Sequence, residues 1–112
     1  MMNKLLILFG MLLVISGCTT SVPNTEHDDF AKFLTSEGIA MAGTEWGPHC
    51  KDQKELFGDS FQYVDYHDCD VDVTWCNDKN VQGYPTWVFS DGQLYPGTRD
   101  IDQLKSLSGY NE

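Results

Sequence analysis

Residues 86–96, TWVFSDGQLYP, constrain the fold more than any other stretch of this chain. Two short runs rich in aromatic and apolar residues flank Asp91-Gly92, and an Asp-Gly pair in this setting is the strongest short-range signal of a β-hairpin. The pattern predicts a strand at 86–90, a tight turn and a returning strand at 93–96. The rest of the chain must therefore pack around a sheet that contains an antiparallel pair.

Helical segments alternate with short apolar runs before the hairpin, and one helix follows it. Asp28 or Asp29 is expected to cap a first helix that ends at Gly38. Pro48 suits the first turn of a second helix, which Gly58 ends. The other expected elements are strands at 39–42 and 61–67, a short helix at 71–80 and a last helix after Asp100. The order α-β-α-β-α-β-β-α predicts an α/β fold, with a mixed sheet flanked by helices.

The N-terminus has the layout of an export signal. A short positive start precedes eleven apolar residues at 5–15, followed by Ser16-Gly17-Cys18. A membrane-spanning helix needs about 20 apolar residues, so this run is too short to be one. We therefore expect a signal peptide at 1–17.

The end of this signal, Ile15-Ser16-Gly17-Cys18, resembles the lipobox of prokaryotic lipoproteins. The resemblance implies cleavage before Cys18 and lipidation of Cys18, which would tether the protein to a membrane. The alternative is an ordinary signal peptide with an incidental cysteine. The expected organisation is a lipoprotein signal at 1–17, a lipidated cysteine with a polar tether at 18–28, and a folded domain at 29–112. The expected location is the cell envelope, on the outer side of the cytoplasmic membrane or in the periplasm.

Charge argues against one class of partner. The formal net charge is −10, with only seven Lys and Arg residues. Binding of nucleic acid needs a basic surface for the phosphates, so no nucleic-acid partner is expected.

The four cysteines are Cys18, Cys50, Cys69 and Cys76. Export implies an oxidising compartment in which disulfides persist. If Cys18 is lipidated, three cysteines remain and one is left over. Cys69 and Cys76, seven positions apart, are the natural intrachain pair, which leaves Cys50 free. Pairing of Cys50 with Cys69 or with Cys76 stays open at this stage.

Two motifs resemble those of the thioredoxin family. Residues 46–50, WGPHC, lie where that family has W-C-x-x-C, after a core strand and at a helix start. Residues 83–86, GYPT, resemble the family's loop with a cis-proline, which precedes the hairpin and faces the redox site. Both positions agree with the predicted order of elements, so the resemblance implies the thioredoxin fold.

A longer resemblance covers residues 39–107. The stretches WGPHCKDQKELFG and VQGYPTWVFSDGQLYPGTRDIDQL are similar to the thioredoxin-like domain that is fused to, or partnered with, bacterial vitamin K epoxide reductase homologues. The resemblance implies a thiol-disulfide oxidoreductase that acts on thiols or disulfides of exported proteins without a cofactor. A vitamin K epoxide reductase-like membrane protein is a candidate partner.

The chain departs from the family at the catalytic position. In the family, the first cysteine of the motif attacks a substrate disulfide, and a helix N-terminus stabilises its thiolate. The second cysteine resolves the resulting mixed disulfide. Here Gly47 replaces the nucleophile, and Cys50 remains as the resolving-type thiol. The resemblance assigns further roles at the catalytic site to Pro48 and His49, and roles in the substrate groove to Trp46, Tyr84 and Pro85.

Dithiol exchange is therefore expected to be impaired or lost, and two functions stay open. One is residual oxidoreductase activity through Cys50, alone or in a rearranged pair. The other is a redox-inactive module that binds a partner protein or peptide. Structural roles are also open, with Trp46 in the core, His49 in solvent and Cys50 as an unreactive buried thiol. No metal site is expected, because the spacing of the soft ligands matches no metal motif; these are His49, Cys50, His67, Cys69 and Cys76.

Overall fold

The computed structural model describes residues 22–111 and contains one mixed four-stranded sheet, in the order β2-β1-β3-β4. The strands are β1 (Ala40–Gly43), β2 (Asp65–Asp68), β3 (Thr86–Val88) and β4 (Leu94–Pro96). β1 and β2 are parallel, whereas β1 with β3 and β3 with β4 are antiparallel. The predicted hairpin is thus confirmed as β3–β4. The predicted signal peptide at 1–17 and Cys18 lie outside the described residues.

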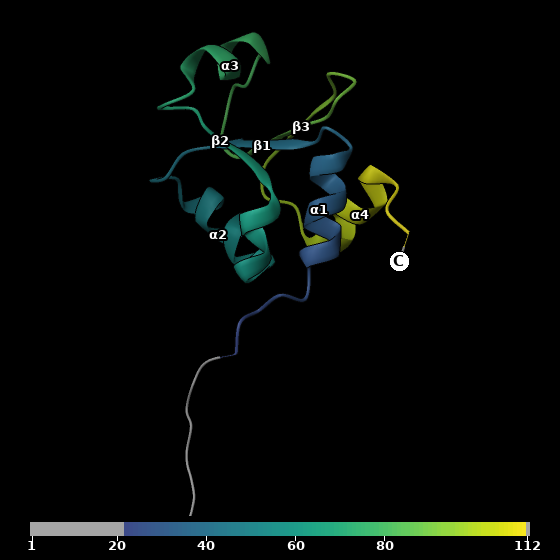
Figure 1. The fold of residues 1–112 in the computed structure, drawn as a ribbon. Coiled ribbons are helices and arrows are strands. Elements are labelled where there is room, and N and C mark those ends of the chain that lie inside the picture. Colours follow the sequence, from purple (N-terminus) through teal and green to yellow (C-terminus); the bar gives the residue numbers. More distant parts are fainter. Residues whose placement is uncertain (1–21, 112) are drawn as a thin grey trace, which may run out of the picture.

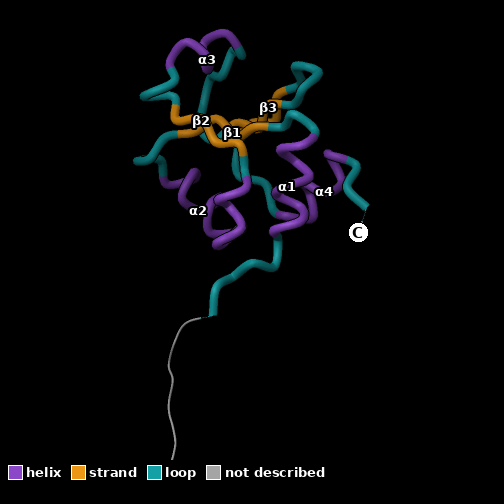
Figure 2. Tube along the Cα trace, viewed as in Figure 1, coloured by secondary structure: helices purple, strands orange, loops and turns teal. Residues whose placement is uncertain are grey.

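Four α-helices cover the two faces of this sheet. They are α1 (Asp28–Ser36), α2 (Pro48–Phe57), α3 (Val73–Asp78) and α4 (Ile101–Ser108). α1, α2 and α4 lie on one face and α3 lies on the other, as Figures 1 and 2 show. The predicted α/β class is confirmed, and the arrangement is consistent with the thioredoxin fold.

The sheet separates two apolar clusters. The larger cluster packs beneath α1, α2 and α4 around Trp87 and Phe57, and it includes Cys50. The smaller cluster lies beneath α3 and contains Cys69 and Cys76. Hence Cys50 and the other two described cysteines belong to opposite faces of the sheet.

Two predicted elements differ from the structure. The strand expected at 61–67 is wrong in its first half, because Gly58–Tyr63 forms a 3-10 helix (η2) and β2 begins at Asp65. Phe61 packs edge-on against Phe57 there, so tertiary contacts override the β-propensity of the aromatic residues. The helix expected at 71–80 is shorter, since a turn in which Asp72 N–H donates to the Asp68 carbonyl comes before it.

The predicted helix caps had mixed outcomes. Neither Asp28 nor Asp29 caps α1, whose N-cap residue is His27. Asp28 instead accepts a hydrogen bond from Ser60 Oγ at 2.7 Å, which ties α1 to η2. Asp100 does cap α4, in a capping box with Gln103. The local sequence was enough to predict the cap of α4. At α1, the Asp28 carboxylate instead accepts a hydrogen bond from Ser60, 32 positions along the chain.

The last residues of the predicted tether contact the domain. Asn24 N–H donates to Asp59 Oδ2 at 2.7 Å, and His27 N–H donates to Ser60 Oγ at 3.1 Å. These contacts fix the chain against η2 just before α1 begins. Within residues 22–111, no helix has the length and apolar character needed to cross a membrane.

A buried amide joins α2 to the hairpin and to the segment before α4. Gln53 is fully buried, and its Oε1 accepts from Trp87 Nε1 at 2.9 Å and from Arg99 N at 2.8 Å. Its Nε2 donates to the Arg99 carbonyl at 2.8 Å. The side chain thus satisfies three polar groups and holds the motif-bearing helix in place.

We expect Gln53→Leu to lower the free energy of unfolding by about 3 kcal/mol or more, because each buried polar group left unpaired costs about 1–3 kcal/mol. Urea unfolding followed by circular dichroism measures the loss. Gln62→Leu is the matched control, since Gln62 is exposed and a surface change is worth about 0.5 kcal/mol or less. A loss below about 1 kcal/mol in Gln53→Leu would contradict this role.

Candidate functional site

The motif begins where β1 ends and α2 starts. Pro48 is the first residue of α2, and Gly47 is its N-cap residue, with φ −71° and ψ 126°. This is an extended conformation that any residue adopts, so the backbone does not require glycine at position 47. The lack of a side chain at position 47 therefore affects the chemistry and packing of the site and is not imposed by the backbone conformation.

Gly47 lies directly over the sulfur of Cys50. A Cβ atom at position 47 would lie 3.3 Å from Cys50 Sγ and 2.9 Å from Thr44 Oγ1. In a disulfide, the Cβ atom of one cysteine lies about 3 Å from the sulfur of the other. The backbone thus keeps the geometry of a two-cysteine motif. Thr44 Oγ1 accepts a hydrogen bond from Gly47 N–H at 3.1 Å and fills the adjacent space.

Cys50 is completely covered, with 0% of its surface exposed. Its sulfur packs against the backbone of Gly43, because a Cβ atom there would lie 2.9 Å from Cys50 Sγ. The Tyr66 ring and the Met41 methyl group approach the same point, at 3.2 Å and 3.4 Å from that Cβ position. The sulfur therefore has no path to a substrate disulfide in this conformation. The structure thus agrees with Cys50 as a buried thiol.

Trp46 and Tyr84 form an exposed aromatic pair beside the motif. Trp46 is 63% exposed and Tyr84 is 40% exposed, and their rings meet edge to face with centroids 6.2 Å apart. The alternative of Trp46 as a core residue is therefore wrong. The peptide bond between Tyr84 and Pro85 is cis, and Pro85 is buried. Thus the structure brings the three residues predicted for a substrate groove together.

Trp46 is also anchored to a third segment. Its Nε1 donates a hydrogen bond to Asp70 Oδ2 at 2.7 Å. Asp70 lies in the loop between β2 and α3, 24 positions along the chain. Sequence reasoning missed this residue, because no local signal pairs an aspartate with a tryptophan so far away.

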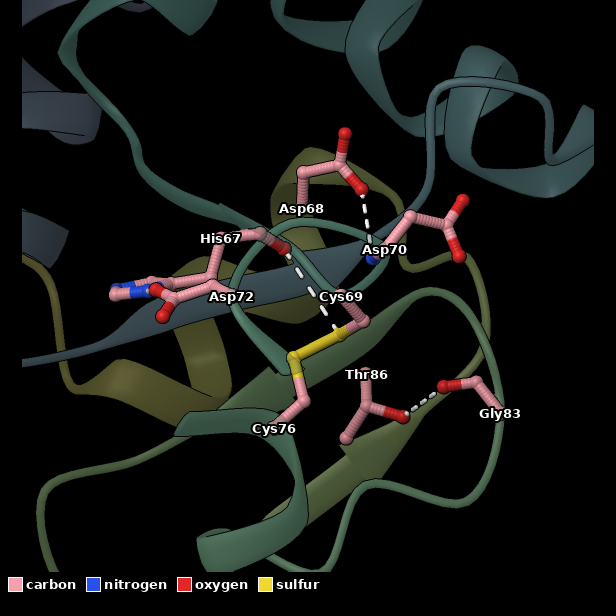
Figure 3. Close-up of a disulfide and its surroundings, with 8 residues drawn as sticks. All are labelled: His67, Asp68, Cys69, Asp70, Asp72, Cys76, Gly83 and Thr86. Atoms are coloured by element: carbon pink, nitrogen blue, oxygen red, sulfur yellow. Dashed lines mark hydrogen bonds and ion pairs between the residues drawn. A yellow bond between two sulfur atoms is a disulfide. The ribbon is translucent and has the colours of Figure 1, made fainter. Parts of the chain in front are cut away.

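Figure 3 shows the disulfide between Cys69 and Cys76, with the loop that it closes. Both residues are buried, at 7% and 5% exposed, and Cys69 N–H donates to the Gly43 carbonyl at 2.8 Å. Cys50 is the free cysteine among residues 22–111. The expected Cys69–Cys76 pair is therefore present, and the rearranged pairs with Cys50 are not.

His67 fixes α3 against the end of β2. Its Nδ1 lies 2.6 Å from Asp72 Oδ2, and its Nε2 lies 3.1 Å from Asp65 Oδ1. Its ring stacks on Trp75, with centroids 3.6 Å apart and planes 4° from parallel. These contacts and the disulfide together hold the loop at 68–73 in one arrangement.

The side chains of Glu45, Lys54 and Tyr66 form a cluster beside the motif on the side of α2. Lys54 Nζ pairs with Glu45 Oε2 at 2.9 Å and lies 4.3 Å from the centroid of the Tyr66 ring. The hydrogen bond from Lys54 lowers the pKa of Glu45. Burial raises the pKa of Tyr66, and the Glu45 carboxylate raises it further. The contacts within this cluster therefore favour a charged Glu45 and a neutral Tyr66.

The remaining predicted site residue, His49, is exposed in the first turn of α2, and its carbonyl accepts from Thr98 Oγ1 at 3.0 Å. Among residues 22–111, no group of three or more His, Cys, Asp or Glu side chains could hold a metal ion. His49 and Cys50 thus stand apart from His67 and the disulfide.

Comparison with known proteins identifies a relative of known class. No protein-family model matches the chain. The chain is 31% identical over 90 residues to thiol-disulfide oxidoreductase LTO1 of Arabidopsis thaliana. The match covers 72% of this chain and 24% of LTO1, so the chain spans about a quarter of that protein's length. The chain is homologous to the thioredoxin-like part of LTO1, and is thus a thioredoxin-like relative of a thiol-disulfide oxidoreductase.

Burial predicts that Cys50 of the native protein reacts with iodoacetamide at least about 100-fold more slowly than in the urea-unfolded chain, because alkylation requires local opening. Mass spectrometry after timed quenching measures the rate. Cys69 and Cys76 should stay unlabelled until a reductant is added. Rapid native labelling of Cys50, or a disulfide that includes it, would contradict the buried-thiol assignment.

Proposed function

We propose that this protein is a membrane-tethered thioredoxin-fold protein of the thiol-disulfide oxidoreductase class, which meets exported proteins and has lost its own dithiol exchange. The observation that carries the proposal is the pair of Gly47 and Cys50: the nucleophile's position holds no sulfur, and the remaining thiol is covered. Homology to a thiol-disulfide oxidoreductase supports the class. The resemblance to vitamin K epoxide reductase-linked domains makes such a membrane protein the candidate partner.

The loss follows from the two steps of the reaction. An exposed thiolate must attack a substrate disulfide, forming one new sulfur–sulfur bond and releasing one substrate thiolate. A second thiolate must then attack the mixed disulfide, which releases the reduced substrate and leaves a disulfide in the enzyme. Without a sulfur at Gly47, the first step has no exposed nucleophile. Cys50 has no partner with which to complete the second.

A redox-inactive binding module is the second candidate, and the exposed Trp46–Tyr84 pair favours it. Large aromatic surface next to a rigid loop is typical of peptide-binding sites. In residues 22–111, no hydrogen bond uses the backbone N–H or C=O of Tyr84. These groups are available to pair with an extended chain laid along the loop. Binding of this kind needs no sulfur.

Gly47→Cys should create dithiol activity, because a Cβ atom at this position lies at disulfide distance from Cys50 Sγ. We expect the reduction of insulin by dithiothreitol to rise by on the order of 100-fold or more over the unchanged protein, whose rate should equal the uncatalysed background. The turbidity of precipitating insulin B chain gives the rate.

Two controls separate sulfur chemistry from packing. Gly47→Ala adds the same Cβ contact with Thr44 without a sulfur, and should stay at background. Gly47→Cys combined with Cys50→Ser tests the need for the pair. If Gly47→Cys lowers stability, Thr44→Ala in the same chain removes the 2.9 Å contact. Catalysis by the unchanged protein at a rate close to that of Gly47→Cys would refute the loss of exchange.

The tether is tested separately at Cys18. Cells that express the protein and grow on an alkyne-tagged fatty acid should yield a labelled protein in the membrane fraction. Cys18→Ser should lose the label and leave the membrane fraction, because one apolar signal of eleven residues does not span a bilayer. Unlabelled protein in the membrane fraction, or equal labelling of Cys18→Ser, would contradict lipidation at this residue.

A further inference from the structure

We propose that the loop at 68–73 and the Trp46–Tyr84 pair form one docking surface, selective for extended protein segments in which Lys or Arg alternates with apolar residues. The inference rests on the proposed function, since it names the class of partner that the same groove takes. We call this surface, made of the loop and the two aromatic residues, the acidic groove wall.

The apolar part of the acidic groove wall extends beyond the aromatic pair. Val71 is 81% exposed and Val73 is 50% exposed, in addition to Trp46 at 63% and Tyr84 at 40%. These four are among the six large apolar side chains exposed in residues 22–111. The hydrogen bond between Trp46 and Asp70 brings the valine-bearing loop to the tryptophan. Exposed apolar side chains on two segments that this bond joins, with Trp46 against the cis-proline loop, indicate a contact surface for another chain.

The negative charge of the acidic groove wall favours a partner with positive charge. Residues 55–78 contain seven carboxylates and no Lys or Arg. Asp70 is exposed, and Asp68 and Asp72 lie on either side of it with partial exposure. The cation before this stretch, Lys54, pairs with Glu45, and the cation after it, Lys79, lies 5.8 Å from the centre of the Trp75 ring. A partner that meets the valines and tryptophan therefore also meets negative charge.

The loop is held rigid before any partner arrives. The Cys69–Cys76 disulfide closes it, as Figure 3 shows, and the His67 ring contacts the Asp72 carboxylate and stacks on Trp75. Asp68 Oδ1 also accepts from Asp70 N–H at 2.9 Å. A rigid surface loses little conformational entropy on binding, which favours recognition by the loop itself.

Other occupants fit these observations less well. A second copy of this chain, with its own formal net charge of −10, would bring the same carboxylates to this surface. An anionic lipid surface would be repelled for the same reason. No group of residues within 22–111 has the composition of a metal site. A segment that combines cationic and apolar side chains is the occupant that satisfies both the exposed valines and the carboxylates.

The test uses two fluorescein-labelled ten-residue peptides without cysteine, one alternating Lys with Val and the other alternating Glu with Val. Fluorescence anisotropy with the purified protein gives the affinity of each peptide at 20 and 300 mM NaCl, where the Debye length is roughly 20 Å and 6 Å and the screening is weak and strong, respectively. We expect the Lys peptide to bind about tenfold more tightly at low salt, with the preference shrinking at high salt. Equal affinities would overturn the inference.

Matched variants locate the preference. Asp70→Asn keeps an oxygen that accepts from Trp46 Nε1 and removes one charge, so the preference for Lys should fall about threefold or more. Asp102→Asn makes the same change of charge at an exposed position on α4 and should leave the preference intact. Equal effects of the two variants would mean that only the overall charge acts, and would overturn the assignment to the loop.

The remaining outcomes separate this inference from the proposed function. Trp46→Ala should weaken both peptides, because the aromatic contact does not depend on charge. If Trp46→Ala weakens binding of both peptides but the unchanged protein shows no preference for the Lys peptide, the surface binds peptides without the proposed selectivity. That result would refute this inference and leave the second candidate function in place. Binding to anionic phosphatidylglycerol vesicles, or self-association by sedimentation that Asp70→Asn changes, would also refute it. The insulin assay of Gly47→Cys is independent of all these results.

Discussion

The packing of the first turn of α2 against the end of β1 decides what this site can do. The Cys50 sulfur presses on the backbone of Gly43, where any larger residue would collide with it at 2.9 Å. Gln53, one turn later on the same helix face, anchors that face to Trp87 and to the Arg99 backbone. This packing holds the thiol inside the core. The chemistry of the motif therefore depends on the residue at position 47.

Elements fixed by local signals could be predicted, and contacts between distant segments could not. The Asp-Gly hairpin, the limits of α2 between Pro48 and Gly58, and the Asp100 cap depend on neighbouring residues and are confirmed. The aromatic run before β2 suits a strand or a packed 3-10 helix equally well, and only its contact with Phe57 decides. The same distinction between local signals and distant contacts applies to the candidate site. Its motif residues were named from the sequence, whereas the bond from Trp46 to Asp70 and the hydroxyl of Thr44 were not.

The sheet gives the described cysteines two separate roles. Cys50 belongs to the core beneath α2, and the Cys69–Cys76 disulfide belongs to the core beneath α3. Closing a loop of this length stabilises a fold by about 2–3 kcal/mol in the chain-entropy account, which is substantial for so small a domain. The same disulfide fixes the loop that carries Asp70. It therefore supports the surface around the motif from the face of the sheet opposite Cys50.

Thr44 occupies part of the space that a side chain at position 47 would need. Its hydroxyl accepts from Gly47 N–H and lies 2.9 Å from where a Cβ atom would stand, closer than side chains normally approach. In this arrangement the hydroxyl satisfies the N–H of the N-cap residue, a donor that the N3 side chain satisfies in a capping box. A cysteine at position 47 would compete with the same oxygen for space. The exposed aromatic pair and the acidic loop beside it have no such conflict, so a side chain at position 47 is compatible with the contact surface that we propose.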